Sequence, residues 1–177
     1  KVSKIILITL SLGFILLAGI WWVNFVRAPV KSDQGTVFNL ANSFSKDNYE
    51  QAKGQGYYYM HPLQFGCVLG MEFIIRLIDN GEAITFQMIN SGFITAIVAL
   101  IYYLTKKIYG DIKVSQNVYL LSGALLVLPL YSVVVYGNIF GLFFSLVAVC
   151  FLFKFYEHYK VRYIFLMTIS MMIAIMF

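Results

Sequence analysis

Long apolar runs constrain this sequence more than any other feature. The first run extends from Ile5 to Val26, and about 20 apolar residues in a helix are enough to cross about 30 Å of hydrocarbon. The whole chain is 60% hydrophobic and 12% charged, whereas soluble domains contain about 45–50% apolar and about 25% charged residues. The sequence therefore predicts an all-α fold, a polytopic transmembrane helix bundle.

The predicted membrane spans lie at about 5–26, 83–105, 114–135, 139–156 and 163–177. Together they predict a single transmembrane domain over residues 1–177. The chain begins at Lys1 and stops at Phe177 inside an apolar run. We therefore expect it to be the N-terminal portion of a larger polytopic protein.

Polar side chains inside the second predicted span should point away from lipid. Gln87, Asn90, Ser91 and Thr95 all fall in this run. Hydrocarbon cannot hydrogen-bond to them, so we expect them to face other helices of the bundle.

The stretch from 27 to 82 is the one long region suited to water, and it predicts two helices on the membrane surface. The first covers about 33–45, with Ser32 or Asp33 placed to cap it. Its apolar residues recur at helical spacing, namely Val37, Leu40, Ala41 and Phe44. The second covers about 62–78 and begins at Pro62, which suits the first turn of a helix.

The 62–78 segment is apolar enough to be mistaken for a span, but its charges favour a surface position. Helical phase places Gln64, Glu72, Arg76 and Asp79 on one face. Glu72 and Arg76 are also four positions apart, in the favourable order for an ion pair. This pattern is typical of a helix lying at the interface with its apolar face in lipid.

The distribution of basic residues predicts the sidedness of the chain. If 62–78 lies on the surface, the cytoplasmic side holds most of the thirteen basic residues, namely Lys1, Lys4, Lys106, Lys107, Lys113, Lys154, Lys160 and Arg162. This agrees with the positive-inside bias, with a cytoplasmic N-terminus and an extracytoplasmic 27–82 loop. A spanning 62–78 segment with an external N-terminus would also satisfy the bias. The net charge of +5 is thus explained without a nucleic-acid partner.

Candidate functional groups gather in the 27–82 loop and in one short turn. Asp33 can act as a general base or bind a divalent cation, or it can simply cap a helix. The aromatic cluster Tyr57, Tyr58 and Tyr59 beside His61 can hold a sugar ring or a lipid head group, or it can be a plain interfacial belt. Tyr136 and Asn138 lie in a turn that faces the same side.

Motifs for other chemistry are missing from the sequence. It contains no GxSxG, P-loop, GxGxxG, HExxH or CxxC pattern. Cys67 and Cys150 lie in apolar surroundings, which indicates two buried thiols and neither a disulfide framework nor a metal site.

The layout resembles that of the GT-C glycosyltransferases. The segments that carry the resemblance are SDQGTVFNLANSF, GQGYYYMHPLQFGCVLGMEFIIRLI and LPLYSVVVYGNIFGLFFSLVAVCFLFKFY. They are most similar to mannosyltransferase-like integral membrane proteins of Gram-positive bacteria. In that family an early acidic residue is followed by an amphipathic helix and then by a Tyr-rich helix that begins with an aromatic or His residue and Pro.

The resemblance implies transfer of a sugar from a polyprenyl-phosphate carrier to an acceptor at the outer face of a bacterial plasma membrane. Asp33 matches the catalytic acid of the loop, and His61 with Pro62 matches the helix start near the donor phosphate. The implied substrate-binding residues are Tyr58, Tyr59, His61, Gln64, Arg76, Tyr136 and Asn138. Asn138 stands where the family often has an acid, and an amide cannot act as a base.

Some properties stay open in the sequence. The metal requirement, the sugar and the acceptor, whether glycan, lipid or protein, are undetermined. Two other functions compete: a transporter or flippase for a lipid-linked precursor, and a non-catalytic membrane assembly subunit. Ionisable residues within spans are expected of a transporter, and the predicted spans contain almost none.

Overall fold

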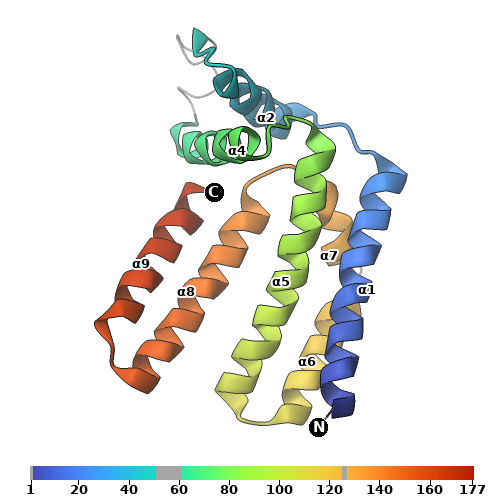
Figure 1. Cartoon of the computed structure of the whole chain (residues 1–177), viewed down its shortest axis with the longest axis vertical. Coiled ribbons are helices and arrows are strands. Elements are labelled where there is room, and N and C mark those ends of the chain that lie inside the picture. Colours follow the sequence, from blue (N-terminus) through green and yellow to red (C-terminus); the bar gives the residue numbers. More distant parts are fainter. Residues whose placement is uncertain (1, 51–60, 125–126) are drawn as a thin grey trace.

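The computed structural model describes residues 2–50, 61–124 and 127–177, and all regular structure in those ranges is helical. Figure 1 shows long helices running side by side and two shorter helices lying across one end of them. The helices are α1 (Val2–Val26), α2 (Ser32–Ser45), η2 (Pro62–Gln64), α4 (Phe65–Ile78), α5 (Ala83–Tyr109), α6 (Ile112–Ala124), α7 (Val127–Leu130), η3 (Tyr131–Val133), α8 (Asn138–His158) and α9 (Val161–Met176).

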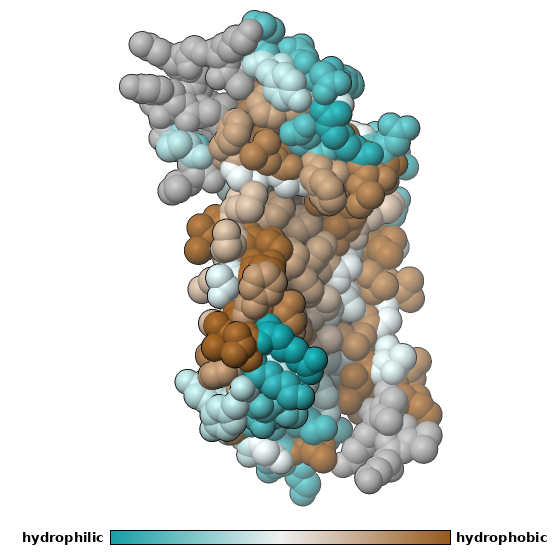
Figure 2. Space-filling view, turned by 60° about the vertical axis from the view of Figure 1, so that its left-hand side comes forward, coloured by the Kyte–Doolittle hydropathy of each residue, from teal (hydrophilic) through white to brown (hydrophobic). Residues whose placement is uncertain are grey.

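Three helices in the described part of the chain are long and apolar enough to cross a membrane. They are Ile6–Val26 of α1, the whole of α5 and the whole of α8. On the face shown in Figure 2, hydrophobic residues cover most of the middle of the molecule and hydrophilic residues gather toward both ends. These observations indicate an α-helical membrane protein, and the three helices coincide with the spans predicted at about 5–26, 83–105 and 139–156.

The span predicted at 114–135 is not one continuous helix. The segments Ile112–Ser122 and Val127–Val133 meet at an angle of 44°. Pro129 lies in the second segment, and proline has no N–H to continue a helical hydrogen-bond ladder. The result is a broken helix, and its two segments together are long and apolar enough to count as one bent span over the predicted region.

The last predicted span, 163–177, corresponds to α9. This helix is apolar and has 16 residues, which at about 1.5 Å per residue is shorter than the hydrocarbon core. It packs along α8 and ends beside α4 (Figure 1).

The two helices predicted within the 27–82 loop both form. α2 and η2 with α4 begin and end close to the predicted limits of 33–45 and 62–78. They pack on each other across the ends of α5, α8 and α9, and we call them the α2–α4 layer (Figure 1). Its core, shared with the start of α5, includes Val37, Phe38, Leu40, Phe44, Val68, Met71, Ile75 and Phe86.

The capping prediction for α2 was wrong. Lys31 occupies the N-cap position with an extended backbone and makes no side-chain capping bond. Ser32 has a positive φ of 55° and Asp33 lies within the first turn. A capping side chain needs the extended backbone that only Lys31 has, so neither Ser32 nor Asp33 caps the helix.

Candidate functional site

A network of amide side chains, half-buried at Gln34 and buried at Gln87 and Asn90, joins the α2–α4 layer to the segment that precedes α8. The side-chain oxygen of Gln34 on α2 accepts a hydrogen bond of 3.0 Å from the backbone N–H of Val135. Val135 is almost fully buried, so few other partners are within its reach. We call Gln34, Gln87, Asn90 and the backbone of residues 132–135 the polar seam.

Two side chains of α5 complete the polar seam. Asn90 donates hydrogen bonds to the carbonyl oxygens of Ser132 at 3.1 Å and Val134 at 2.8 Å. Gln87 donates to the carbonyls of Ala28 at 2.9 Å and Val133 at 3.1 Å. Non-helical backbone needs such partners wherever water is excluded. The seam therefore fixes the 132–135 segment and the linker between α1 and α2 on the same face of α5.

These contacts confirm that polar residues of the second span face the bundle. Gln87, Asn90 and Ser91 are all buried. Thr95 is half-buried and donates its hydroxyl to the Ser91 carbonyl within its own helix at 2.9 Å. Gln34, in contrast, had no distinguishing signal in the sequence, because its partner lies 101 positions away.

Asp33 lies next to the polar seam but points to solvent. It is exposed in the first turn of α2, and no hydrogen bond or ion pair joins its carboxylate to another described residue. The positive end of the helix dipole stabilises a carboxylate in that position. The side chain is thus held on a fixed helix and remains available to a ligand.

The turn before α8 approaches this layer through its backbone rather than through Asn138. The Asn138 amide is exposed and donates to the Tyr131 hydroxyl at 3.1 Å. Tyr136 is half-buried and packs against the core of the α2–α4 layer. The described contacts to the 27–82 loop thus come from Val135 and Tyr136, and that Asn138 faces this loop stays a prediction.

A second link joins this turn to α4. The Cys67 thiol forms a hydrogen bond with the backbone of Gly137, and burial raises the pKa of the thiol to about 11. The neutral thiol is the form that apolar surroundings favour. Cys67 is consequently a packing residue, as its apolar sequence context predicted.

Glycines bring α9 close to both elements. A Cβ on Gly137 would lie 2.2 Å from the carbonyl oxygen of Phe177, and one on Gly66 would lie 2.6 Å from that of Met176. Such distances exclude any larger side chain without movement of backbone. The end of α9 therefore packs closely against both α4 and the start of α8.

Arg76 connects α4 to the end of α2. Its guanidinium donates to Glu72 at 3.0 Å, to Asp47 at 2.7 Å and to the Phe44 carbonyl at 2.6 Å. The predicted Glu72–Arg76 ion pair is confirmed. Arg76 holds the pKa of the Asp47 carboxyl below its ordinary value. The guanidinium thus already interacts with two carboxylates.

The remaining predicted residues lie around the start of α4. His61 is exposed and Gln64 is half-buried, and the Gln64 side-chain oxygen is buried without a hydrogen-bond partner among the described residues. Tyr57, Tyr58 and Tyr59 lie outside the described residues. No three His, Cys, Asp or Glu side chains within the described ranges gather closely enough to hold a metal ion.

An apolar groove of about 540 Å³ lies beneath α4. Its walls come from α4, α5, α8 and α9 and include Leu69, Phe73, Leu77, Phe93, Phe140 and Phe144. Phe73 and Leu77 are also 67% and 72% exposed, which is unfavourable in water and suited to lipid. The arrangement thus combines a carboxylate, a polar turn and an apolar groove at one end of the bundle.

No family model matches the chain, and comparisons with curated proteins and with solved structures find no significant match.

Proposed function

We propose that this chain belongs to an inverting GT-C type glycosyltransferase. It would transfer a sugar from a polyprenyl-phosphate carrier to an acceptor at the extracytoplasmic face of a bacterial plasma membrane. The observation that carries the proposal is the Gln34–Val135 hydrogen bond. It fixes the turn of α2 that bears Asp33 against the segment leading to Asn138.

Asp33 is the proposed general base toward the acceptor. An exposed carboxylate on a rigid helix can accept the proton of an attacking hydroxyl, which is the role that inversion requires of a single base. Asn138 and Tyr131, which hydrogen-bond to each other, would contribute polar contacts to the substrate. His61, Gln64 and the tyrosines before them are retained as proposed substrate-binding residues.

A cation must offset the charge of the carrier phosphate as it leaves. Arg27 is the better candidate because it is exposed at the end of α1. Arg76 is the weaker one, since Glu72 and Asp47 already balance its charge.

The apolar groove beneath α4 supports a lipid-linked donor. Its surface is almost entirely hydrocarbon, with aromatic rings from α4, α5 and α8. An isoprenoid tail is a ligand of matching chemistry, and burial of its methylene groups is favourable. A nucleotide sugar would leave this groove without a role.

The α2–α4 layer is proposed to lie on the outer leaflet. The opposite end of the bundle carries basic residues near the C-terminal ends of α5 and α8, in the loop after α8 and in the first turns of α6 and α9, namely Lys106, Lys107, Lys113, Lys154, Lys160 and Arg162. The positive-inside bias assigns that end to the cytoplasm. The α2–α4 layer, with Asp33, would then be extracytoplasmic.

Sidedness is tested by single cysteines at positions 33, 61 and 111 in a background without Cys67 and Cys150. A membrane-impermeant thiol reagent should label positions 33 and 61 in intact cells, and position 111 only after permeabilisation. Labelling of all three positions from one side would refute the proposed topology.

Activity is tested by incubating the purified full-length protein with radiolabelled polyprenyl-phosphate sugars, and separately with nucleotide sugars. Transfer only from the lipid-linked donors supports the proposal. Movement of the donor across proteoliposome membranes without transfer would indicate the flippase alternative instead. Absence of both activities, with a stable partner protein bound, would indicate an assembly subunit.

A further inference from the structure

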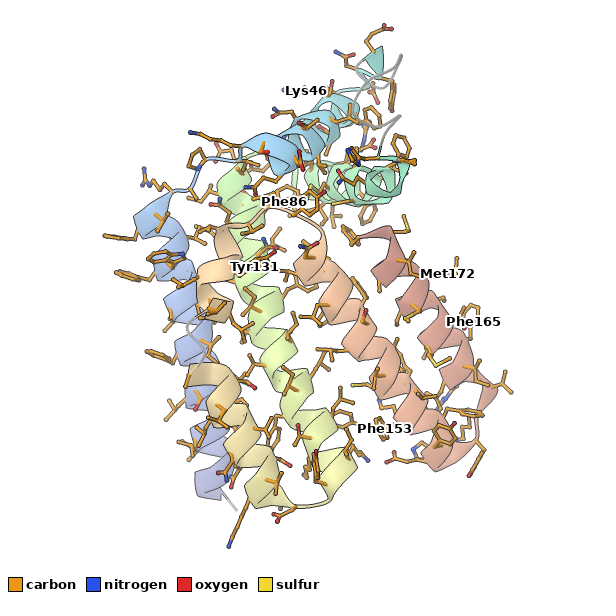
Figure 3. The ribbon with its side chains drawn as sticks, turned by 180° about the vertical axis from the view of Figure 1, so that it is seen from behind. Lys46, Phe86, Tyr131, Phe153, Phe165 and Met172 are labelled. Carbon is orange, nitrogen blue, oxygen red and sulfur yellow. The ribbon has the colours of Figure 1, made fainter. Side chains whose placement is uncertain are left out.

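A second cleft, polar in character, lies between the C-terminal ends of α2 and α4. Its volume is about 540 Å³. The polar residues that line it are Asn42, Ser45, Lys46, Arg76, Asp79 and Asn80. Figure 3 shows Lys46 on the far side of the α2–α4 layer from the bundle, above Phe86. The cleft is therefore separate from the apolar groove beneath α4.

The charges around the cleft favour no ion of either sign strongly. Arg76 is paired with Asp47 and Glu72, and the other charged lining residues are one cation, Lys46, and one carboxylate, Asp79. A phosphate would meet Asp79, and a metal cation would meet Lys46. Binding either ion would cost desolvation free energy, and the cleft has no excess of the opposite charge to offset that cost.

The hydrogen-bonding groups suit a ligand with many hydroxyls. Ser45 donates to the Asn42 carbonyl at 2.9 Å, and the Asn80 side-chain oxygen accepts from the Glu82 N–H at 2.8 Å. Among the described residues, no hydrogen bond or ion pair engages the Lys46 ammonium or the Asp79 carboxylate. One is a triple donor and the other an acceptor, and a hydroxyl can satisfy both at once.

Gly81 keeps the cleft in this shape. A Cβ at this position would lie 1.9 Å from the side-chain oxygen of Asn42. Any larger residue would require the Asn42 side chain to move from its position at the edge of the cleft. The close approach therefore holds the Asn42 amide at the edge of the cleft.

We propose that this cleft binds an uncharged carbohydrate portion of the acceptor, at a distance from the reacting hydroxyl. Asn42 lies about 14 Å from Asp33 along α2, at the helical rise of about 1.5 Å per residue. That separation exceeds one sugar ring, so the acceptor would be an oligosaccharide or a glycan chain. The assignment to an acceptor rests on the proposed transferase function, whereas carbohydrate binding in the cleft does not.

The test is saturation-transfer NMR on the purified full-length protein in lipid nanodiscs, with maltose, mannobiose, cellobiose and N-acetylchitobiose as probes and inorganic phosphate as competitor. At least one disaccharide should bind and phosphate should not displace it. The double variant Lys46→Ala with Asp79→Asn should weaken binding about tenfold or more, because hydrogen bonds to charged groups are lost. Asn is chosen at position 79 because it tolerates the left-handed backbone, where φ is 53°.

The matched control is Lys160→Ala with Asp111→Asn, which makes the same charge changes at the opposite end of the bundle. It should bind the probe like the unaltered protein, while Gly81→Ala should block binding by displacing Asn42.

The proposal is overturned if no disaccharide binds, if phosphate displaces the bound disaccharide, or if both cleft variants bind it normally. Asp33→Asn should retain binding. If binding depends on the cleft but no transfer occurs in any assay, the transferase proposal fails and the cleft assignment stands.

Discussion

The Gln34 side chain and the Val135 backbone N–H, 101 positions apart, are joined by a hydrogen bond of 3.0 Å. This bond sets the position of α2 relative to the turn that precedes α8. Since Asp33 is the neighbour of Gln34, the same bond sets the position of the proposed base.

Replacing Gln34 should loosen this contact. Gln34→Ala leaves the buried Val135 N–H without its partner, a loss of about 1–3 kcal/mol. Thermal unfolding in detergent should show a lower midpoint, and transfer activity should fall even in protein that remains folded. Asn39→Ala, an exposed position on the same helix, is the control and should change neither. Equal behaviour of the two variants would contradict a positioning role.

Asn90 should be the more sensitive member of the polar seam. Asn90→Leu removes both hydrogen bonds to the 132–134 backbone and takes the Asn90 donor from the Ser132 carbonyl, at a cost of about 1–3 kcal/mol. The Val134 carbonyl still accepts from the Tyr136 N–H at 3.0 Å. The control is Thr95→Val, because that hydroxyl bonds only within α5. The measurement is the thermal unfolding midpoint of each variant, which should fall more in Asn90→Leu than in Thr95→Val. A larger loss in Thr95→Val would show that the seam contributes little.

Gly137, the N-cap residue of α8, and Gly92, inside α5, should respond oppositely to alanine. Gly137→Ala would place a Cβ 2.2 Å from the Phe177 carbonyl oxygen, and such overpacking costs about 1–3 kcal/mol. Gly92→Ala meets nothing within 4 Å and should be neutral or slightly stabilising, by up to about 1 kcal/mol. Unfolding of the full-length protein measures both. Similar stability would mean that α9 does not pack tightly on Gly137.

The Arg76–Asp47 pair should make part of the stability depend on acid. The pKa of Asp47 is lower in the folded protein than its ordinary value, with the Arg76 hydrogen bond as the main cause. The stabilisation of the folded state by this pair is therefore complete above the ordinary pKa of an aspartate, near pH 4. It is lost as the pH falls through the lower pKa that Asp47 has in the folded protein. The unfolding midpoint should fall less between neutral pH and about pH 3 in Asp47→Asn than in the unaltered protein. Parallel acid curves would show that the pair adds nothing.

The sequence predicted what depends on local pattern. Apolar length located α1, α5 and α8, and helical phase located α2, α4 and the Glu72–Arg76 pair. It did not predict Gln34, because a hydrogen bond to a distant backbone N–H leaves no periodic signal. It also did not predict the break within the 114–135 span, where Asn90 donates hydrogen bonds to the backbone carbonyls of Ser132 and Val134.

The capping error at α2 has a similar origin. Ser32 and Asp33 are favourable capping residues by type, but the backbone conformation decides which residue caps. The linker from α1 is held by the Gln87 bond to Ala28, and the extended conformation falls on Lys31. Asp33 is thereby left inside the first turn with an exposed carboxylate.

The most direct test of the central claim compares Asp33→Asn with Glu82→Gln in the full-length protein. Each replaces an exposed carboxylate of the same loop with its amide. The measurement is the rate of sugar transfer from a polyprenyl-phosphate donor, normalised to folded protein. Loss of a general base predicts a fall of about 100-fold or more for Asp33→Asn and an unchanged rate for Glu82→Gln. An unchanged rate in Asp33→Asn, at an equal level of folded protein, would contradict the account.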